Sequence, residues 1–360
     1  VLAAFLRHCD HFRPTLVDVD ACLGALVRCN FGGALEEEKL IRLLQHLQEA
    51  LPSASGYGDA GRQIAHSAWA LARLLGSQAA LSAELMARVD YLFAEIERVA
   101  RPLLDDKFDL RNIAVLAWAL AKVGKGSQAL FGELGDAALI RADKLTLQES
   151  SVLVWTFATV KLRHELLSKL TSRVIEEESE LKETPGSFIS MLVWGYATLS
   201  TRQAELFRAA AAVAQARIHR FNVIGIANLM WAFAHLREHA PFQHAVLEHL
   251  QRDRRWEQLE LQGCSMILWS LARLRHDGRG ELFYHFLADR KLVPQADFFQ
   301  AQDLSNSLWA FATARVRHAP VFRALAARAS AIAASFNPQA LANTLWACAR
   351  LQMAPPQLLA

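Results

Sequence analysis

The sequence predicts an all-α superhelix, an α-solenoid of about eight helical hairpins of about 38 residues each. Eight of the nine tryptophans recur at intervals of 37 to 49 residues, and alanine stands three residues after each of the eight. Alanine and leucine, which favour helices, are more abundant than valine, isoleucine and tyrosine, which favour strands. The recurring tryptophans are Trp69, Trp118, Trp155, Trp194, Trp231, Trp269, Trp309 and Trp346.

The residues around each tryptophan follow the period of an amphipathic helix. Apolar residues recur at positions −5, −2, −1, 0, +2, +3 and +5 relative to tryptophan. This period is seen in segments such as IAHSAWALARL (64–74), IANLMWAFAHL (226–236) and LANTLWACARL (341–351). So broad an apolar stripe predicts a helix that packs on two sides. We therefore expect the tryptophans to lie in the core, and the alanine at +3 to mark the close approach of a neighbouring helix.

The start of this first helix also repeats. An apolar residue stands ten residues before tryptophan in six repeats, and a capping residue often follows it. Thr146 and Glu149 have the spacing of a capping box, and Pro338 suits the first helical turn. A second helix follows each first helix, often after a proline. The apolar residues are Phe108, Leu145, Phe221, Leu259, Phe299 and Phe336, and the expected caps are Asp109, Thr146, Asn222 and Asn337.

Two regions differ in how well they keep the repeat. Residues 1–58 are predicted to form a degenerate N-terminal capping repeat and a loop, because VDACLGALVRC (19–29) aligns with the motif when Gly24 replaces tryptophan. Residues 59–360 are predicted to form the solenoid repeats. The long interval between the first two tryptophans predicts an extra turn or a long helix around residues 83–104.

Composition limits the classes of function. With 53% hydrophobic and 21% charged residues the chain is not disordered, and no apolar run is long enough to cross a membrane. We find no phosphate-binding loop, nucleophile elbow or pair of carboxylates on one apolar face, so we expect no enzyme, no cofactor and no small-molecule substrate. The segment HCDH (8–11) lacks a second pair of ligands, so we expect no metal site.

Basic side chains gather near the end of each first helix. Positions −3, +1 and +4 are expected to share one face, and the windows from −5 to +8 hold twelve basic but only two acidic residues. Stacked hairpins would align these cations into a stripe for phosphates; the preference of cations for helix C-termini is the alternative explanation. The candidate RNA-binding residues at +4 to +8 are Arg73, Lys122, Lys161, Arg163, Arg202, His235, Arg237, Arg273, Arg275, Arg315, Arg317 and Arg350, and those at −3 are His66, Asn228, Asn306 and Asn343.

The segment LANTLWACARLQMAPPQLL (341–359) resembles the octotricopeptide repeat, a helical hairpin with a Leu-x-Asn-x-Leu-Trp-Ala-x-Ala core. It is also similar to the related repeats of organellar RNA-binding proteins that carry a RAP domain. The resemblance covers residues 60–360, and it implies an α-solenoid that binds RNA in mitochondria or plastids. Only Asn228, Asn306 and Asn343 keep the asparagine at −3, which departs from the family pattern.

These observations lead to one main functional expectation. We expect an organellar RNA-binding protein, a structural subunit that stabilises fragmented ribosomal RNA in a mitochondrial ribosome or a similar particle, with RNA and neighbouring proteins as partners. The alternatives are a protein–protein scaffold in a large organellar complex and a factor for messenger RNA stability or processing. The plastid is the alternative location.

Overall fold

The computed structural model describes residues 2–9, 11–29, 36–56, 58–76, 82–105, 107–176, 178–238, 240–274 and 278–353. Over these residues it contains helices and turns and no strand, which confirms the prediction of an all-α fold. The chain divides into two compact units, Val1–Glu176 and Glu177–Ala360. We refer to them as unit 1 and unit 2 and treat each separately.

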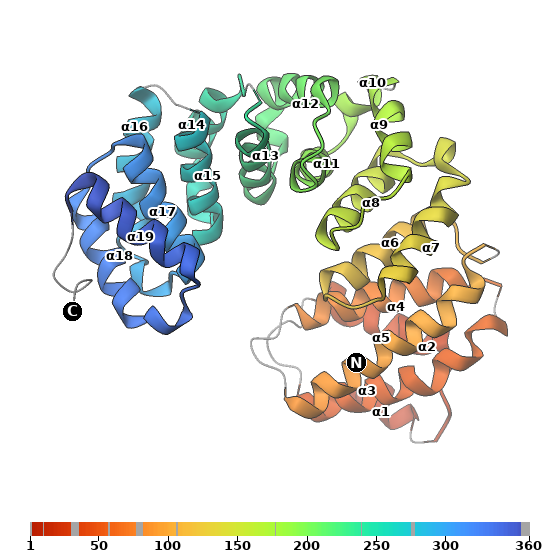
Figure 1. Ribbon diagram of the computed structural model, residues 1–360. Helices are drawn as coiled ribbons and strands as arrows, with labels where there is room; N and C mark the ends of the chain where they lie inside the picture. The colour runs from red at the N-terminus through yellow and green to blue at the C-terminus, as the bar shows by residue number, and fades with distance from the viewer. Residues whose placement is uncertain are drawn as a thin grey trace. The chain divides into compact units, whose positions relative to one another are not determined.

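Unit 1 is built from helical hairpins whose first helices pack side by side. Helices α2, α4, α6 and α8 form this first layer, and α3, α5, α7 and α9 are the second helices of the hairpins (Figure 1). The tryptophan motif lies on α4, α6 and α8. The bounds are α1 Leu2–Cys9, α2 Leu16–Arg28, α3 Glu37–Ala50, α4 Ala60–Leu75, α5 Ala83–Ala100, α6 Leu110–Lys122, α7 Gln128–Leu139, α8 Leu147–Thr159 and α9 Leu166–Glu176.

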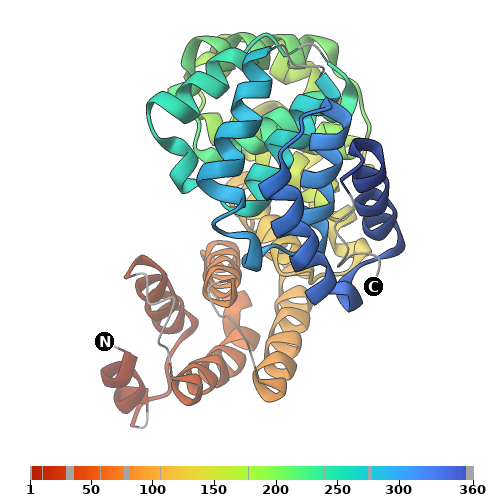
Figure 2. The same cartoon turned by 90° about the vertical axis from the view of Figure 1, so that its left-hand side faces the viewer.

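Unit 2 repeats this plan after the short helix α10. Helices α11, α13, α15, α17 and α19 carry the tryptophans and pack in succession; in Figure 2 the teal to dark blue helices α15, α17 and α19 again lie side by side. The bounds are α10 Glu178–Glu183, α11 Gly186–Thr198, α12 Ala204–Arg217, α13 Val223–Leu236, α14 Gln243–Arg252, α15 Leu261–Leu274, α16 Gly278–Leu287, α17 Ala301–Ala314, α18 Ala319–Ala331 and α19 Pro338–Leu351. Each unit therefore shows the packing of neighbouring hairpins that an α-solenoid requires.

The helix starts follow local sequence signals. The side chains of Asp109, Asn222 and Asn337 accept hydrogen bonds from backbone N–H groups of the first turns of α6, α13 and α19. Thr146 and Glu149 form the capping box of α8, and Pro338 is the first residue of α19. These predictions are confirmed. The apolar residues that precede the caps are buried in five of the six repeats, and Phe336 is partly exposed.

Close packing between successive first helices depends on small residues. The alanine at +3 is buried in seven of the eight repeats, which confirms its predicted place at a helix contact. Leu304 and Leu308 of α17, at −5 and −1, are 0% exposed, whereas Leu341 and Leu345 occupy the same positions of α19 and are 46% and 42% exposed. The −5 and −1 face of α17 is therefore covered within unit 2, while that of α19 remains open to solvent among the described residues.

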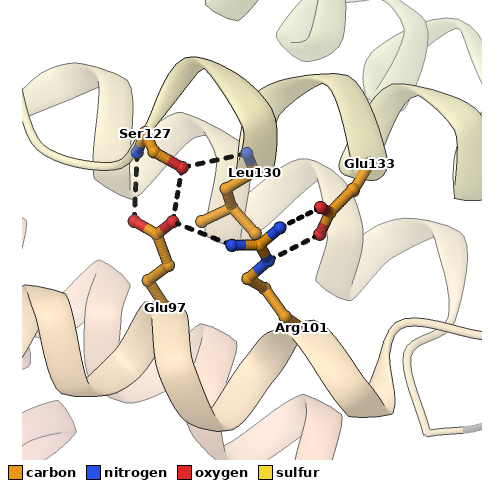
Figure 3. Close-up of polar contacts among 5 residues, drawn as sticks. All are labelled: Glu97, Arg101, Ser127, Leu130 and Glu133. Carbon is orange, nitrogen blue, oxygen red and sulfur yellow. Dashed lines mark hydrogen bonds and ion pairs between the residues drawn. The ribbon is translucent and has the colours of Figure 1, made fainter.

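The long first interval of the repeat is explained by α5, which has 18 residues and ends in the 3₁₀ turn Arg101–Leu103. A polar network joins this segment to α7 (Figure 3). Glu97 accepts hydrogen bonds from the backbone N–H of Ser127, at 3.0 Å, and from its hydroxyl group. Arg101 donates to both carboxylate oxygens of Glu133, with Nε–Oε2 at 2.8 Å, and its Nη1 lies 3.9 Å from Glu97. These bonds link second helices of successive hairpins.

Glycine at the tryptophan position makes room for a neighbouring side chain. Gly24 lies on α2, which packs against α4, and a Cβ atom there would stand 2.7 Å from the His66 ring. His66 Nδ1 lies 2.7 Å from a carboxylate oxygen of Asp20, and its ring stacks on Trp69 at 5.2 Å. The degenerate motif in residues 19–29 therefore packs as a first helix without a tryptophan. The boundary near residue 58 stays a prediction.

Candidate nucleic-acid interface

The repeated tryptophans do not lie in the core, so that prediction is wrong. Trp346 is 44% exposed, and the other seven are partly exposed. The reason is geometric: a first helix such as α17 is covered by its neighbouring first helices and its own second helix, and one line along it remains uncovered. Tryptophan suits such a line, because its large ring packs at the edges while one side stays in water.

The exposed line follows positions −3, 0 and +4, which corrects the expectation that +1 shares this face. At about 100° per residue, −3, 0 and +4 lie within about 60° of one another, whereas +1 is turned away. All eight residues at +1 are buried, and all eight at −3 are partly exposed. We call this line of positions the tryptophan face. The small residues at +1 serve close packing between helices.

Four pairs of tryptophans on successive helices lie near one another, one pair in unit 1 and three in unit 2. In unit 1 the ring centroids of Trp118 and Trp155 are 6.4 Å apart. In unit 2 the corresponding distances are 6.2 Å for Trp194 and Trp231, 6.1 Å for Trp269 and Trp309, and 6.4 Å for Trp309 and Trp346. We call these neighbouring rings the aromatic row: one pair in unit 1, and one pair and one triplet in unit 2.

Position +4 places cations or imidazole against these rings. The guanidinium carbon of Arg273 lies 4.8 Å from the centroid of Trp269, and that of Arg350 lies 6.0 Å from Trp346. The His235 ring stacks on Trp231 at 4.6 Å. Partial burial, and then the charge of Arg273, hold the pKa of His235 below its usual value, so we expect it to be neutral at pH 7. His235 therefore offers a ring and a hydrogen-bonding nitrogen rather than a charge.

The candidate residues at −3 lie on the same face but differ in their contacts. Asn228, Asn306 and Asn343 are partly exposed on α13, α17 and α19, and all three are in unit 2. His66 is held by Asp20 and Trp69 in unit 1. The three asparagine amides are thus the polar groups at −3 that stand beside the tryptophan row of unit 2.

The basic candidates fall into two groups. Arg202 donates to the backbone oxygen of Leu236 at 2.7 Å and lies 3.7 Å from Glu238, and Arg273 donates to the backbone oxygen of Ala234 at 3.1 Å. These two cations bind the C-terminal carbonyl groups of α13, as the alternative explanation expects.

Most of the other candidates project into solvent. Seven are exposed and form no ion pair with any other described residue, namely Arg73, Lys122, Lys161, Arg237, Arg315, Arg317 and Arg350. Arg163 is exposed as well, and it does interact with another residue. Arg275 lies outside the described residues. The free cations stand at the C-terminal ends of first helices in both units.

The first helices end in a shared backbone geometry. Position +6 has a positive φ in six repeats, at Gly124, Lys161, Ser200, Arg237, Arg315 and Gln352. Glycine adopts this left-handed conformation freely, whereas other residues are strained by about 1 kcal/mol. A lysine or arginine stands there in three repeats although glycine would be more stable. We expect the charge at this position to have a use other than folding.

Replacing Arg315 by glycine tests that inference. We expect Arg315→Gly to raise the free energy of unfolding by about 0.5–1 kcal/mol, because the strain at φ 59° disappears, and to weaken RNA binding by about fivefold. Ser200→Gly removes the same strain without a change of charge, so it should stabilise the protein and leave binding unchanged. Chemical denaturation and RNA titration measure the two effects. Equal RNA affinities for the two variants would refute a role for the Arg315 charge.

Sequence reasoning missed a further position on this face. Position −7 lies two turns before tryptophan, about 20° from it around the helix. Its residues are polar in seven repeats, and glutamine recurs at Gln148, Gln262, Gln302 and Gln339, all exposed. Recurrence of glutamine at a fixed distance from tryptophan was the available signal. These amides extend the tryptophan face toward the helix N-termini.

The described residues contain no cluster of histidine, cysteine, aspartate and glutamate able to hold a metal ion. In the same part of the chain, no helix is long and apolar enough to cross a membrane.

Comparison with known proteins gives one limited relationship. No protein-family model matches the chain. A segment of 101 residues is 35% identical to a protein named "RAP domain-containing protein, chloroplastic" from Oryza sativa subsp. japonica. The match covers 27% of this chain and 15% of the rice protein. Together with the helical fold, this similarity fits a helical-repeat protein related to RAP domain-containing proteins.

Proposed function

We propose that this protein binds single-stranded RNA along its tryptophan faces in an organelle, as a binding protein and not an enzyme. The observation that carries the proposal is the repeated combination of a partly exposed tryptophan with exposed cations that form no ion pair among the described residues. These cations stand at +4 on the tryptophan face or just beyond it, at the C-terminal end of the same helix. Aromatic rings accept bases of any sequence, and cations accept the phosphates between them.

Single-stranded RNA fits this surface better than a duplex. Bases in a duplex are stacked on each other and cannot reach an aromatic ring, whereas the bases of loops and single strands can. The asparagines at −3 and the glutamines at −7 add groups that can donate and accept hydrogen bonds at base edges. Because −3 is apolar in four repeats, we expect contacts to backbone and rings to dominate over sequence reading.

The finer assignment follows from that expectation. Weak sequence reading suits a structural subunit that stabilises ribosomal RNA, including RNA made of several fragments, beside neighbouring proteins of a large assembly. The rice relative is named chloroplastic, which supports an organellar location and favours the plastid over the mitochondrion we expected first. A role in messenger RNA stability or processing uses the same surface.

A protein–protein scaffold is the second candidate, favoured by a specific observation. The net charge is only +3, and the partly exposed tryptophans could pack against an apolar helix or peptide of a partner protein. Such a partner would bind with little dependence on salt, whereas phosphates release counterions when they bind.

Filter binding of a ten-nucleotide oligouridylate across a salt series separates the candidates. We expect binding at low salt that weakens steeply as salt rises, with a logarithmic slope of about −3 to −5 from five to seven phosphate contacts. Absence of retention at about 20 mM salt would refute RNA binding and leave the scaffold.

A further inference from the structure

Unit 2 contains a cavity of about 630 Å³ where the C-terminal ends of α13 and α15 meet α17. The side chains that matter for its chemistry are Arg237, Glu238, Gln243, Arg273, Trp309 and Thr313. A volume of this size is typical of a site for one small molecule or one nucleotide. The cavity borders the tryptophan face, because Trp309 and Thr313 are the 0 and +4 positions of α17.

The cavity wall carries two guanidinium groups with incomplete compensation. Arg237 is exposed and forms no ion pair among the described residues, and Arg273 donates to a backbone oxygen. Both arginines line the cavity, and burial, followed by the charge of Arg237, lowers the pKa of Arg273. An anion placed between them would remove this repulsion.

The rest of the wall suits a base. Trp309 supplies an aromatic surface, and the Thr313 hydroxyl has no hydrogen-bond partner among the described residues. The side chain of Glu238 is 25% exposed. Its carboxylate forms a long ion pair with Arg202, with Nε and Oε1 3.7 Å apart. A carboxylate only accepts hydrogen bonds, so its best partner presents two adjacent donors.

Guanine meets this requirement. Its Watson–Crick edge presents N1–H and the N2 amino group side by side, whereas adenine and cytosine each pair one donor with an acceptor and uracil has a single donor between two acceptors. We propose that this cavity takes one guanosine of the bound RNA: Arg237 and Arg273 hold its phosphate, Trp309 contacts its base, and Glu238 accepts from N1–H and N2–H. This inference rests on the proposed function.

The test compares four RNAs and three proteins. The RNAs are the ten-nucleotide oligouridylate and its variants with one central guanosine, adenosine or cytidine. The original protein should bind the guanosine variant about tenfold more tightly than oligouridylate. Its affinities for the adenosine and cytidine variants should lie within about threefold of its affinity for oligouridylate. In Glu238→Gln the guanosine preference should fall below about threefold, because an amide cannot accept both hydrogen bonds.

Glu205→Gln is the matched control. Glu205 is exposed on α12 and does not line the cavity, so its loss changes the net charge equally and should keep the tenfold preference. If every RNA binds and the guanosine adds less than twofold, or if Glu238→Gln keeps the preference, the guanosine site is refuted and RNA binding stands. If no RNA binds, the proposed function fails. Micromolar binding of free guanosine monophosphate without a preference among the RNAs would assign the cavity to a free nucleotide instead.

Discussion

Replacing Arg237, Arg315, Arg317 and Arg350 together with glutamine is expected to weaken binding of the oligouridylate by about 100-fold at about 150 mM salt. All four side chains are exposed at the C-terminal ends of α13, α17 and α19 and form no ion pair with another described residue. Each phosphate contact contributes about 0.7 to the logarithmic salt slope of a single strand, so the slope should become shallower by about 3. The salt series of filter binding measures both effects.

The matched control removes four cations from the second helices of unit 2 and from the short helical turns that follow them. Arg208, Arg220, Arg290 and Arg323 are exposed and likewise form no ion pair among the described residues. Their joint replacement by glutamine changes the net charge by the same amount. We expect it to weaken binding by less than about fivefold, through long-range attraction alone. Equal losses in the two variants would contradict a defined phosphate path and point to non-specific attraction.

Features that depend on a few neighbouring residues were predictable from the sequence. The caps Asp109, Asn222 and Asn337 need only one side chain and the backbone of the next turn. The buried alanines at +3 were predictable because their recurrence beside a large residue reports a helix contact. Such signals are complete within about ten residues of sequence.

The exposure of the tryptophans was not predictable from the apolar period alone. The period shows that residues share a face, but it does not show how many neighbours cover that face. Trp309 has apolar neighbours at −1 and +2, yet the cover comes from α15, α19 and α18, and none of them reaches across the tryptophan face completely. The polar residues one or two turns away, such as Gln302 at −7, were the better guide to exposure.

The partners of Arg202 and Arg273 depend on the stacking of hairpins. Arg202 donates to an oxygen 34 residues later, and Arg273 to one 39 residues earlier. A basic residue at the end of a helix is compatible with a phosphate, a carboxylate or a neighbouring carbonyl group, and only the tertiary arrangement selects among them. The position of these cations at helix ends was therefore predictable from the sequence. Which of them bind neighbouring carbonyl groups, and which remain available to a ligand, was not.

Replacing Gly61 by alanine is expected to lower the free energy of unfolding of unit 1 by about 3 kcal/mol. Gly61 is buried in the first turn of α4, where the backbone that leads into α6 passes directly over it. A Cβ atom would overlap the carbonyl oxygen of Lys107 and stand 3.0 Å from the Cα atom of Phe108. Because these are backbone atoms, no change of side-chain rotamer can relieve the overlap, and α4 and α6 must separate.

Gly132→Ala is the control, since it is the same substitution in a helix of the same unit. Gly132 lies within α7 with nothing within 4 Å of its Cβ position, so alanine should stabilise the helix by up to about 1 kcal/mol. Hydrogen exchange of amides in α4 and α6, followed by mass spectrometry of the full chain, reads unit 1 without interference from unit 2. Faster exchange in Gly61→Ala together with slower exchange in Gly132→Ala is the expected result. Unchanged exchange in Gly61→Ala would mean that α4 and α6 are less closely packed than the structure has them, and the close stacking of first helices on which the aromatic row depends would fail with it.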